Sequence, residues 1–305
     1  MKRRLIRSDK ALREFPLYVM LIPAVFLVAI YSYGSMAGVV IAFQKFVPAK
    51  GFFGQQQWVG LQNFQTLFSM PNIWPIIRNT VVIAVCKMIG GIVVPVVFAL
   101  LLNEVRSIAA KRIFQTLVYL PNFLSWIILS GILIDILSPS DGFVNVLLSR
   151  LGTKPVFFLG NPKVFPPTMV VTDIWKGFGF GTIIYLAALT SIDPTLYESA
   201  MIDGANRWQQ TWHITLTGIS STIVLMTVLS LANILNGGFD QIYNMYSPVV
   251  YSTGDILDTF VYRMGIEQAQ YSISTAAGLF KSAVSLVFIV ASYYLADRLA
   301  GYRVF

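Results

Sequence analysis

The chain of 305 residues is strongly apolar: 56% of its residues are hydrophobic and only 12% carry a charge. Soluble domains carry about 25% charged residues, so this composition excludes a disordered chain and argues against an ordinary water-soluble domain. The formal net charge of +8 would suggest nucleic-acid binding on a soluble protein, but on so apolar a chain the positions of the charges matter first. A single cysteine, Cys86, excludes an internal disulfide framework and a multi-cysteine metal site.

Long uncharged stretches predict six transmembrane helices. The first stretch is 30 residues long and lies between Glu14 and Lys45, which exceeds the ~20 helical residues that cross a hydrocarbon core. The other predicted spans are approximately Ile77–Leu102, Ile113–Leu137, Thr168–Leu189, Ile214–Leu235 and Ala276–Leu299. Backbone polar groups in lipid must be hydrogen-bonded within their own segment, so each span is expected to be an α-helix. The predicted fold is therefore all-α, with a single polytopic membrane domain over residues 1–305.

The distribution of basic residues predicts the orientation in the membrane. The predicted cytoplasmic tail, residues 1–16, holds six Lys or Arg residues, and its side of the membrane holds 12 of the 22 in short segments. The longer loops of the opposite side, at about 43–76, 138–167 and 236–274, hold only seven when Arg78, just beyond the first of them, is included. The positive-inside rule therefore places both termini in the cytoplasm. A cleaved signal peptide is the alternative for the first span, although its apolar stretch exceeds the usual 7–15 residues.

The predicted cytoplasmic loop at 190–213 contains a short helix with its own start and stop signals. Asp193 is a favourable N-cap, Pro194 suits the first helical position, and Gly204 suits a left-handed residue at the end. Local chemistry leaves two roles open. The helix is either a connector that rests on the bilayer surface or a docking element for a partner.

The same loop resembles the signature of the membrane subunits of type I ABC importers, in which Glu-Ala-Ala is followed by Gly and then by Ile-x-Leu-Pro. Here the motif reads Glu198-Ser199-Ala200, Gly204 and Ile214-Thr215-Leu216-Thr217, with the family spacing throughout. Ser199 replaces an alanine, and Thr217 replaces the proline. Further similarities extend over essentially the whole chain, at Gly60–Phe64, Asn79-Thr80, Tyr119-Leu120-Pro121 and Gly238–Tyr243. The stretch Asp258–Arg263 is similar to the oligosaccharide-importing branch.

The resemblance implies the permease fold of these importers and a transmembrane pathway for oligosaccharides, including acidic polysaccharide fragments. It also implies a bacterial cell membrane location and three kinds of partner: a second homologous permease, two ATP-binding subunits and an extracytoplasmic solute-binding protein. Membrane lipid is a further partner, expected from the apolar spans themselves. Residues 194–204 would then be the coupling helix that contacts an ATPase. The coupling residues implied by the resemblance are Glu198, Ser199, Ala200, Asp203 and Gly204.

These 305 residues contain no G-x-x-x-x-G-K-[ST] motif, which is the phosphate-binding loop of many ATPases. ATP and Mg²⁺ are therefore expected on the partner subunits, and this chain is expected to have no catalytic residue, cofactor or metal site of its own. No nucleic-acid partner is expected either, because the surplus of basic residues is explained by the membrane topology.

Charged side chains inside the predicted spans mark candidate pathway residues, because each costs about 2.5–3.5 kcal/mol to insert. Asp173 and Lys176 are three residues apart and share a helix face. They are expected either to form a structural ion pair or to line the pathway, where Lys176 would meet a uronate carboxylate. Lys87 also lies inside a span, but the sequence names no partner for it. Lys281 is expected to extend to the outer membrane surface.

Polar residues near the end of the fifth span recur at i, i+3 and i+6, which places Ser230, Asn233 and Asn236 on roughly one face. They are expected to form interhelical hydrogen bonds or to line the pathway. In maltose-type relatives, residues on the helices before and after the signature loop contact the sugar. The resemblance places the matching positions, counted from Glu198, at Asp173, Lys176, Gly177, Ser230 and Gly237. On the third span the resemblance adds Asn122 and Trp126, whose flat ring suits the C–H side of a pyranose.

A second class of function remains open at this point. An ion-gradient-driven secondary transporter or channel would place ionisable residues at the midplane of broken helices. Lys87, Asp173 and Lys176 fit that description as well.

Overall fold

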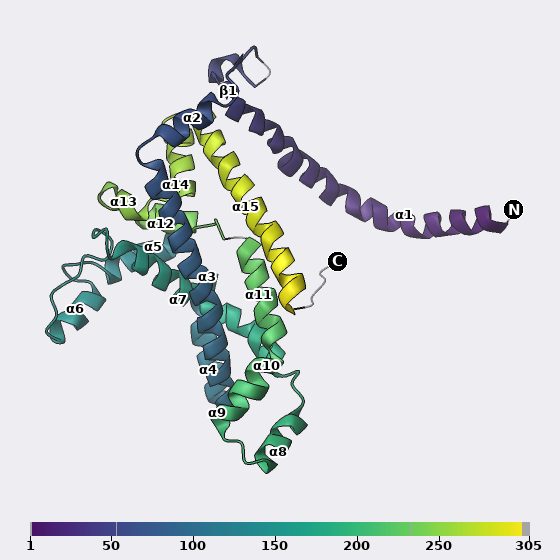
Figure 1. Cartoon of the computed structure of the whole chain (residues 1–305), viewed down its shortest axis with the longest axis vertical. Coiled ribbons are helices and arrows are strands. Elements are labelled where there is room, and N and C mark those ends of the chain that lie inside the picture. Colours follow the sequence, from purple (N-terminus) through teal and green to yellow (C-terminus); the bar gives the residue numbers. More distant parts are fainter. Residues whose placement is uncertain (1, 53, 233, 301–305) are drawn as a thin grey trace. The chain divides into compact units, whose positions relative to one another are not determined.

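The computed structural model describes residues 2–52, 54–232 and 234–300, and helices dominate this part of the chain (Figure 1). Its contacts divide the chain into two compact units. One unit comprises the chain up to Leu67 together with Met264–Leu279, and the other comprises Phe68–Arg263 together with the chain from Phe280 onward. The predicted all-α class is confirmed, because the strands of the described residues are two residues long.

The first unit begins with a long apolar helix. α1 (Lys2–Val28) contains Pro16 and Pro23 and continues into a π-helical turn, Ala29–Gly34, and a 3₁₀ segment, Ala37–Phe43. The described span Phe15–Phe43 buries none of its most apolar window within the chain. Its exposed apolar side chains are therefore suited to lipid or to another subunit.

A small hairpin follows α1. β1 (Gln44–Lys45) pairs antiparallel with β2 (Gln57–Trp58), with Gln44 opposite Trp58. The Asn63 side chain, at the start of α2 (Gln62–Ser69), donates to the carbonyl oxygens of Ala42 at 2.8 Å and Gln44 at 3.0 Å. These bonds attach α2 to the end of the first apolar segment.

The second unit contains the helices that carry the predicted pathway and coupling residues. They are α3 (Ile73–Glu104), α4 (Ile108–Tyr119), α5 (Trp126–Ile136), α6 (Phe143–Arg150), α7 (Phe165–Leu189), α8 (Pro194–Ile202), α9 (Arg207–Gln210), α10 (Leu216–Gly218), α11 (Ser220–Ala232), α12 (Phe239–Met245), α13 (Tyr251–Gly254) and α14 (Leu257–Tyr262). α15 (Tyr271–Ala300) begins in the first unit and ends in the second. Short 3₁₀ or π segments lie at Pro48–Lys50, Leu120–Phe123, Thr211–Thr215, Pro248–Val250 and Arg263–Glu267.

α3 and α7 pack side by side and form the centre of the second unit (Figure 1). A Cβ atom on Gly90 of α3 would lie 2.0 Å from the Ile174 side chain of α7, and one on Gly179 of α7 would lie 2.1 Å from the carbonyl oxygen of Val118. Small residues at these positions let the helix backbones approach closely, as is common between membrane helices.

Two predicted spans are bent rather than straight. The predicted helix Ile113–Leu137 is divided into Ile108–Phe123 and Trp126–Ile136, which meet at 106°. Pro121 lies in the 3₁₀ turn before the bend, and Ser125 caps α5 by accepting a hydrogen bond from the backbone N–H of Ile128. The fifth predicted span is likewise bent by 56° between Gly218 and Ser220.

By length and composition, the described residues contain three helices that can cross a membrane, or up to five if each bent pair counts as one span. The remaining predicted span, Thr168–Leu189, is helical as part of α7 but lies outside that count. The charged side chains of Asp173 and Lys176 lower the mean hydropathy of α7.

Candidate functional site

Lys87 forms the centre of a buried polar group in the second unit. Its side chain is only 8% exposed, and its Nζ donates to the Gly237 carbonyl oxygen at 2.9 Å and to Gln241 Oε1. Asp173 Oδ1 lies 3.4 Å from the same Nζ and forms an ion pair with it. The three donors of the ammonium group are therefore directed at three acceptors, which offsets much of the cost of burying its charge.

The orientation of the Gln241 amide is determined by its other hydrogen bonds. Its Nε2 donates to the Met169 carbonyl oxygen and to Thr172 Oγ1, each at 2.8 Å, and the residue is fully buried. The amide oxygen is consequently directed toward Lys87. This arrangement joins α3, α7 and the start of α12 through one lysine.

Gly238 makes room for the ammonium group of Lys87. Its φ of +86° lies in the left-handed region, where residues other than glycine are disfavoured. A Cβ atom at this position would lie 2.6 Å from Lys87 Nζ. Glycine is therefore required here both by backbone conformation and by space.

A cavity of about 420 Å³ lies beside this polar group. Lys87 and Asp173 contribute to one part of its wall, and Ser230 and Asn236 contribute to another. Asp173 is one-third exposed, so its carboxylate contacts both Lys87 and the open space. The remaining lining residues are mostly apolar: Ala84, Met88, Gly91, Met226, Leu229, Ile234 and Gly238.

Three further predicted pathway residues lie close together at the bend between α4 and α5. Lys176 Nζ donates to the Asn122 carbonyl oxygen at 3.2 Å and lies 5.3 Å from the centre of the Trp126 ring. Lys176 is half-buried, and no carboxylate within the described residues forms an ion pair with it. The bend thus brings a flat aromatic ring under an ammonium group, a favourable cation–π arrangement.

Of the two alternatives for Asp173 and Lys176, the ion pair between them is wrong, although the two residues do share α7. Asp173 pairs with Lys87 instead, because α3 packs against α7 and presents the lysine to it. Lys281, which is expected to extend to the outer membrane surface, forms an ion pair with Asp258 of the predicted outer loop. In both cases a tertiary contact determines the partner.

The other predicted pathway residues take different places. Ser230 and Asn236 line the cavity, and Gly237 is buried with its carbonyl oxygen bonded to Lys87. Gly177 is exposed, with open space where a Cβ atom would lie. Asn233 lies outside the described residues. Sequence reasoning did not identify Gln241 or Gly238 as part of the site. The one sequence signal for them was Lys87, because a lysine inside a predicted span requires buried acceptors.

The coupling loop has the predicted helix, α8. Asp193 Oδ1 accepts a hydrogen bond from the Thr195 backbone N–H at 2.9 Å, and this bond, with a further one from the Thr195 side chain, holds the pKa of the Asp193 carboxyl below its usual range. Gly204 has a φ of +80°, and the following N–H, of Ala205, donates to the Ala200 carbonyl oxygen at 2.8 Å. The predicted start and stop signals are confirmed.

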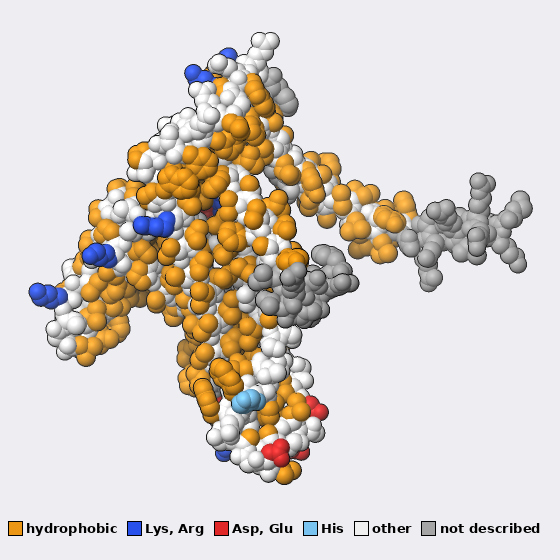
Figure 2. Space-filling model, in the orientation of Figure 1, with side chains coloured by type: hydrophobic (Ala, Val, Ile, Leu, Met, Phe, Trp, Pro, Cys, Tyr) orange, Lys and Arg blue, Asp and Glu red, His pale blue; other side chains and the backbone are white. Residues whose placement is uncertain are grey.

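α8 presents its side chains outward, and none of its residues is buried. Leu196, Met201 and Ile202 are 52%, 57% and 87% exposed, and Glu198 is exposed as well. Figure 2 shows acidic side chains gathered at the end of the second unit where α8 lies in Figure 1. The helix therefore offers an apolar surface with negative charge beside it.

The two halves of the loop motif contact each other. Tyr197, directly before Glu198, shares a hydrogen bond of 3.0 Å between its hydroxyl and Thr215 Oγ1. Beside this contact lies a second cavity of about 310 Å³, whose wall includes Ala200, Asp203 and Gly204. Ser199 donates its hydroxyl to the Thr195 carbonyl oxygen at 2.9 Å, so its hydroxyl is satisfied within the helix.

Comparisons with known proteins agree with this arrangement. Residues 91–301 match the family described as binding-protein-dependent transport system inner membrane component. The chain is 41% identical, over 94% of its length and 90% of the relative, to protein LplB of Bacillus subtilis (strain 168). It is 40% identical, over 98% of its length and 91% of the relative, to the polygalacturonan/rhamnogalacturonan transport system permease protein YteP of the same organism.

The fold is also similar to solved structures. One is the crystal structure of a bacterial ABC transporter involved in the import of the acidic polysaccharide alginate, with a TM-score of 0.88, 39% identity and coverage of 97% of this chain and 99% of the other. Another is that of the bacterial alginate ABC transporter in complex with an alginate pentasaccharide-bound periplasmic protein, with a TM-score of 0.88 and 38% identity over the same shares of the two chains. The family match includes both the cavity residues of α7 to α12 and the coupling loop. The chain therefore belongs to the family of binding-protein-dependent transport system inner membrane components, the permeases of ABC importers.

Proposed function

We propose that this chain forms part of the transmembrane pathway of an ATP-driven importer of oligosaccharides, with acidic polysaccharide fragments as its substrates. It receives substrate from an extracytoplasmic solute-binding protein and works with a second homologous permease and two separate ATP-binding subunits. The names of the similar proteins support this assignment, since one relative is named for transport of polygalacturonan and one similar structure for import of alginate. Both polymers are acidic.

The observation that carries the substrate class is the difference between two lysines of the pathway region. Lys87 is paired with Asp173, so its charge is compensated within the chain. Lys176 contacts a carbonyl oxygen and the Trp126 ring but has no carboxylate partner among the described residues. A cation inside a membrane span is costly unless it is paired, and the carboxylate of a uronate residue would supply that pair.

Trp126 supplies the second half of such a site. A flat, partly exposed indole ring covers the C–H side of a pyranose, while a nearby ammonium group binds the ring carboxylate. The residues that meet at the bend between α4 and α5 can therefore recognise both parts of an acidic sugar. The cavity with Ser230 and Asn236 offers further hydrogen-bonding groups for sugar hydroxyls.

ATP binding and hydrolysis belong to the partner subunits in this proposal, because these 305 residues contain no phosphate-binding loop motif. Movements of the ATP-binding subunits are transmitted to the pathway through α8. Glu198 is the main polar contact with an ATP-binding subunit, and Asp203 and Gly204 lie at the end of α8 where the chain turns back into the membrane. Both termini then lie in the cytoplasm, and the loop 236–274 lies on the outer side.

Uptake measurements on the importer in proteoliposomes test the substrate class. The Lys176→Gln variant should raise the KM for a galacturonate pentasaccharide by about tenfold, because a charge-assisted hydrogen bond is lost, and should leave the uptake of a neutral arabinooligosaccharide unchanged. The matched control is Lys163→Gln, an exposed loop lysine, which should behave like the wild type. An unchanged KM for the acidic sugar would contradict the role of Lys176.

The same system tests the rival class, an ion-gradient-driven transporter or channel. Purification of the tagged chain should recover a second permease and an ATP-binding subunit, and uptake should require ATP inside the vesicles. Uptake that is driven by an ion gradient when the ATP-binding subunit is absent would overturn the proposal.

A further inference from the structure

Five aromatic side chains form a continuous row along α12, α13 and α14. The row consists of Phe239, Tyr243, Tyr262, Tyr246 and Tyr251, and the ring centres of neighbouring members are 4.8–5.9 Å apart. All five side chains are partly exposed rather than buried. Tyr246 packs partly against the hydrophobic core, and the partial exposure of all five rings leaves ring surface available for contact.

The row begins directly after a residue that lines the cavity of the candidate site. Gly238 lines that cavity, and Phe239, the first ring of the row, is the next residue. From Phe239 the rings lead through Tyr243 and Tyr246 to Tyr251, in the loop that the proposed topology places on the outer side. A ligand held by these rings would therefore lie along the segment that leads to the cavity wall at Gly238.

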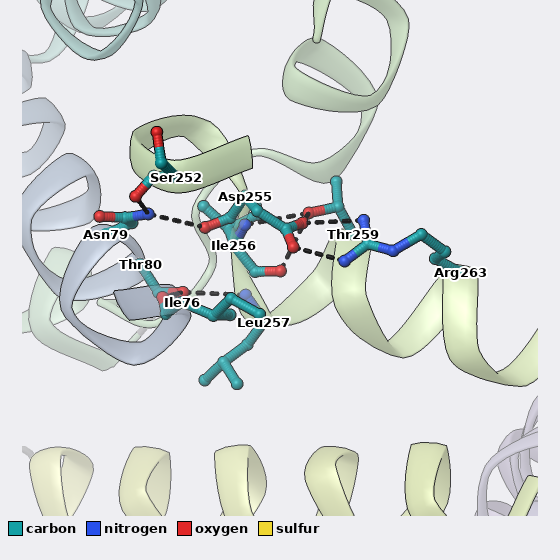
Figure 3. A network of polar contacts seen from close by, with 9 residues as sticks. All are labelled: Ile76, Asn79, Thr80, Ser252, Asp255, Ile256, Leu257, Thr259 and Arg263. Carbon is teal, nitrogen blue, oxygen red and sulfur yellow. Dashed lines mark hydrogen bonds and ion pairs between the residues drawn. The ribbon is translucent and has the colours of Figure 1, made fainter. Parts of the chain in front are cut away.

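The segment that carries the row is firmly attached to α3 (Figure 3). The Asn79 side chain donates to the Ser252 carbonyl oxygen at 3.1 Å and to the Asp255 carbonyl oxygen at 3.4 Å. Thr80 Oγ1 accepts from the Leu257 backbone N–H at 2.9 Å. The rings are thus held in place before any ligand binds, which reduces the entropy lost on binding.

The electrostatic character of the row is close to neutral. Arg263 lies 4.6 Å from the centre of the Tyr251 ring, but its guanidinium group is paired with both carboxylate oxygens of Asp255, which is 2% exposed. Burial, together with a hydrogen bond to Tyr251, raises the pKa of Tyr246 above its usual range, so its hydroxyl stays protonated. Ring faces with neutral hydroxyls at their edges suit a sugar, which has apolar C–H faces and a rim of hydroxyls.

We propose that this aromatic row is a binding site for consecutive sugar rings of an oligosaccharide, through which the substrate passes from the solute-binding protein into the cavity. The inference rests on the proposed function and adds a site to it outside the pathway residues. Stacking acts on the C–H faces of a sugar and is independent of its charge. The affinity of the row therefore depends on the length of the oligosaccharide, whereas Lys176 and Trp126 select the acidic group.

The test uses the complete importer in proteoliposomes, with galacturonate di- and pentasaccharides as probes. The double variant Phe239→Leu/Tyr243→Leu keeps apolar volume but removes two ring faces. We expect the KM for the pentasaccharide to rise about tenfold, by the loss of two aromatic contacts, and the KM for the disaccharide to rise much less. Tyr243→Phe, which keeps the ring, should raise the KM for the pentasaccharide at most about twofold.

The matched control is Phe157→Leu, which removes an aromatic ring that is 55% exposed in a different loop of the same proposed side. It should leave both KM values unchanged. An unchanged pentasaccharide KM in the double variant would overturn the inference. A loss that is equal for both sugars and that accompanies loss of the solute-binding protein from the purified complex would also overturn it, because the row would then be a protein contact.

A labelling experiment covers the case in which the double variant does not assemble. In a Cys86→Ser background, Tyr251→Cys should react with a membrane-impermeant maleimide from outside, and the pentasaccharide should slow that reaction severalfold. Labelling that the sugar does not affect would contradict the inference. If the wild-type importer takes up neither sugar, the proposed function fails, whereas wild-type uptake with unaffected row variants refutes the aromatic row alone.

Discussion

The coupling loop and the Lys87 group are stabilised in opposite ways. α8 has no buried residue, and its ends are defined by bonds between neighbours in the chain, such as the one from Thr195 to Asp193. Lys87 is almost completely buried, and its acceptors Asp173, Gly237 and Gln241 lie far from it in the sequence. A locally defined helix can move as a unit, whereas the Lys87 group couples several helices to one another.

This difference matches the proposed roles of the two regions. A coupling element must transmit movement from a partner, so an outward-facing helix with its own caps is suitable. The wall of a pathway must keep its shape while helices around it move, so a buried ion pair with additional hydrogen bonds is suitable there. Substitutions in the two regions should therefore differ mainly in their effect on stability.

The largest effect on stability is expected for Lys87→Met. The substitution leaves the Asp173 carboxylate and the Gly237 carbonyl oxygen without their donor, and it should lower the free energy of unfolding by about 3 kcal/mol. Unfolding of the purified complex in detergent measures this quantity. The double variant Lys87→Met/Asp173→Asn should recover part of the loss, because the unpaired charge is removed. If the single variant unfolds like the wild type, the ion pair does not stabilise the fold.

A smaller but clear effect is expected for Gly238→Ala. The new Cβ atom would lie 2.6 Å from Lys87 Nζ at a φ of +86°, and the variant should be destabilised by about 1–3 kcal/mol. Gly177→Ala is the matched control, since it adds a methyl group to α7 where nothing lies within 4 Å. Its unfolding free energy should stay within about 0.5 kcal/mol of the wild type. Equal effects of the two substitutions would contradict the close packing around Lys87.

The smallest effect is expected at the start of α8 and depends on pH. The pKa of Asp193 is lowered in the folded state by its hydrogen bonds, so the cap contributes at pH values above the usual carboxyl pKa of about 3.9 and is lost as pH falls through the folded-state pKa. Hydrogen exchange of the Thr195 amide should therefore be protected from neutral pH to about pH 4 and lose protection as the pH falls further.

Asp193→Asn separates the cap from its charge. Asparagine caps a helix as well as aspartate does, so this variant should keep the protection of the Thr195 amide and lose its dependence on pH. Asp203→Ala, at the other end of α8, should leave that amide unaffected. Protection of Thr195 that depends on pH in the Asn variant would show that another group is responsible.

The sequence allowed prediction of the features that depend on neighbouring residues. Asp193, Pro194 and Gly204 defined α8, and the uncharged stretches identified the long apolar helices. The bend before α5 was missed, although Pro121 and the capping residue Ser125 are local signals for it. The unbroken apolar character of the stretch concealed them.

Long-range partners could not be predicted in the same way. Spacing on one helix suggested that Asp173 pairs with Lys176, but the packing of α3 on α7 determines the observed partner, Lys87. Gln241 is separated from Lys87 by 154 positions, and a neutral side chain gives no charge signal. By contrast, Asn122, Trp126 and Lys176 were predicted individually, and the structure brings them together.

The most direct test of the account is a joint measurement of sugar uptake and ATP hydrolysis in the reconstituted importer with Glu198→Lys. This substitution reverses one exposed charge on α8, away from the cavity and from the aromatic row. We expect that the complex still assembles and hydrolyses ATP but that uptake of the galacturonate pentasaccharide is lost. Uptake at the wild-type rate in this variant would contradict the role of α8 as the link between ATP hydrolysis and transport.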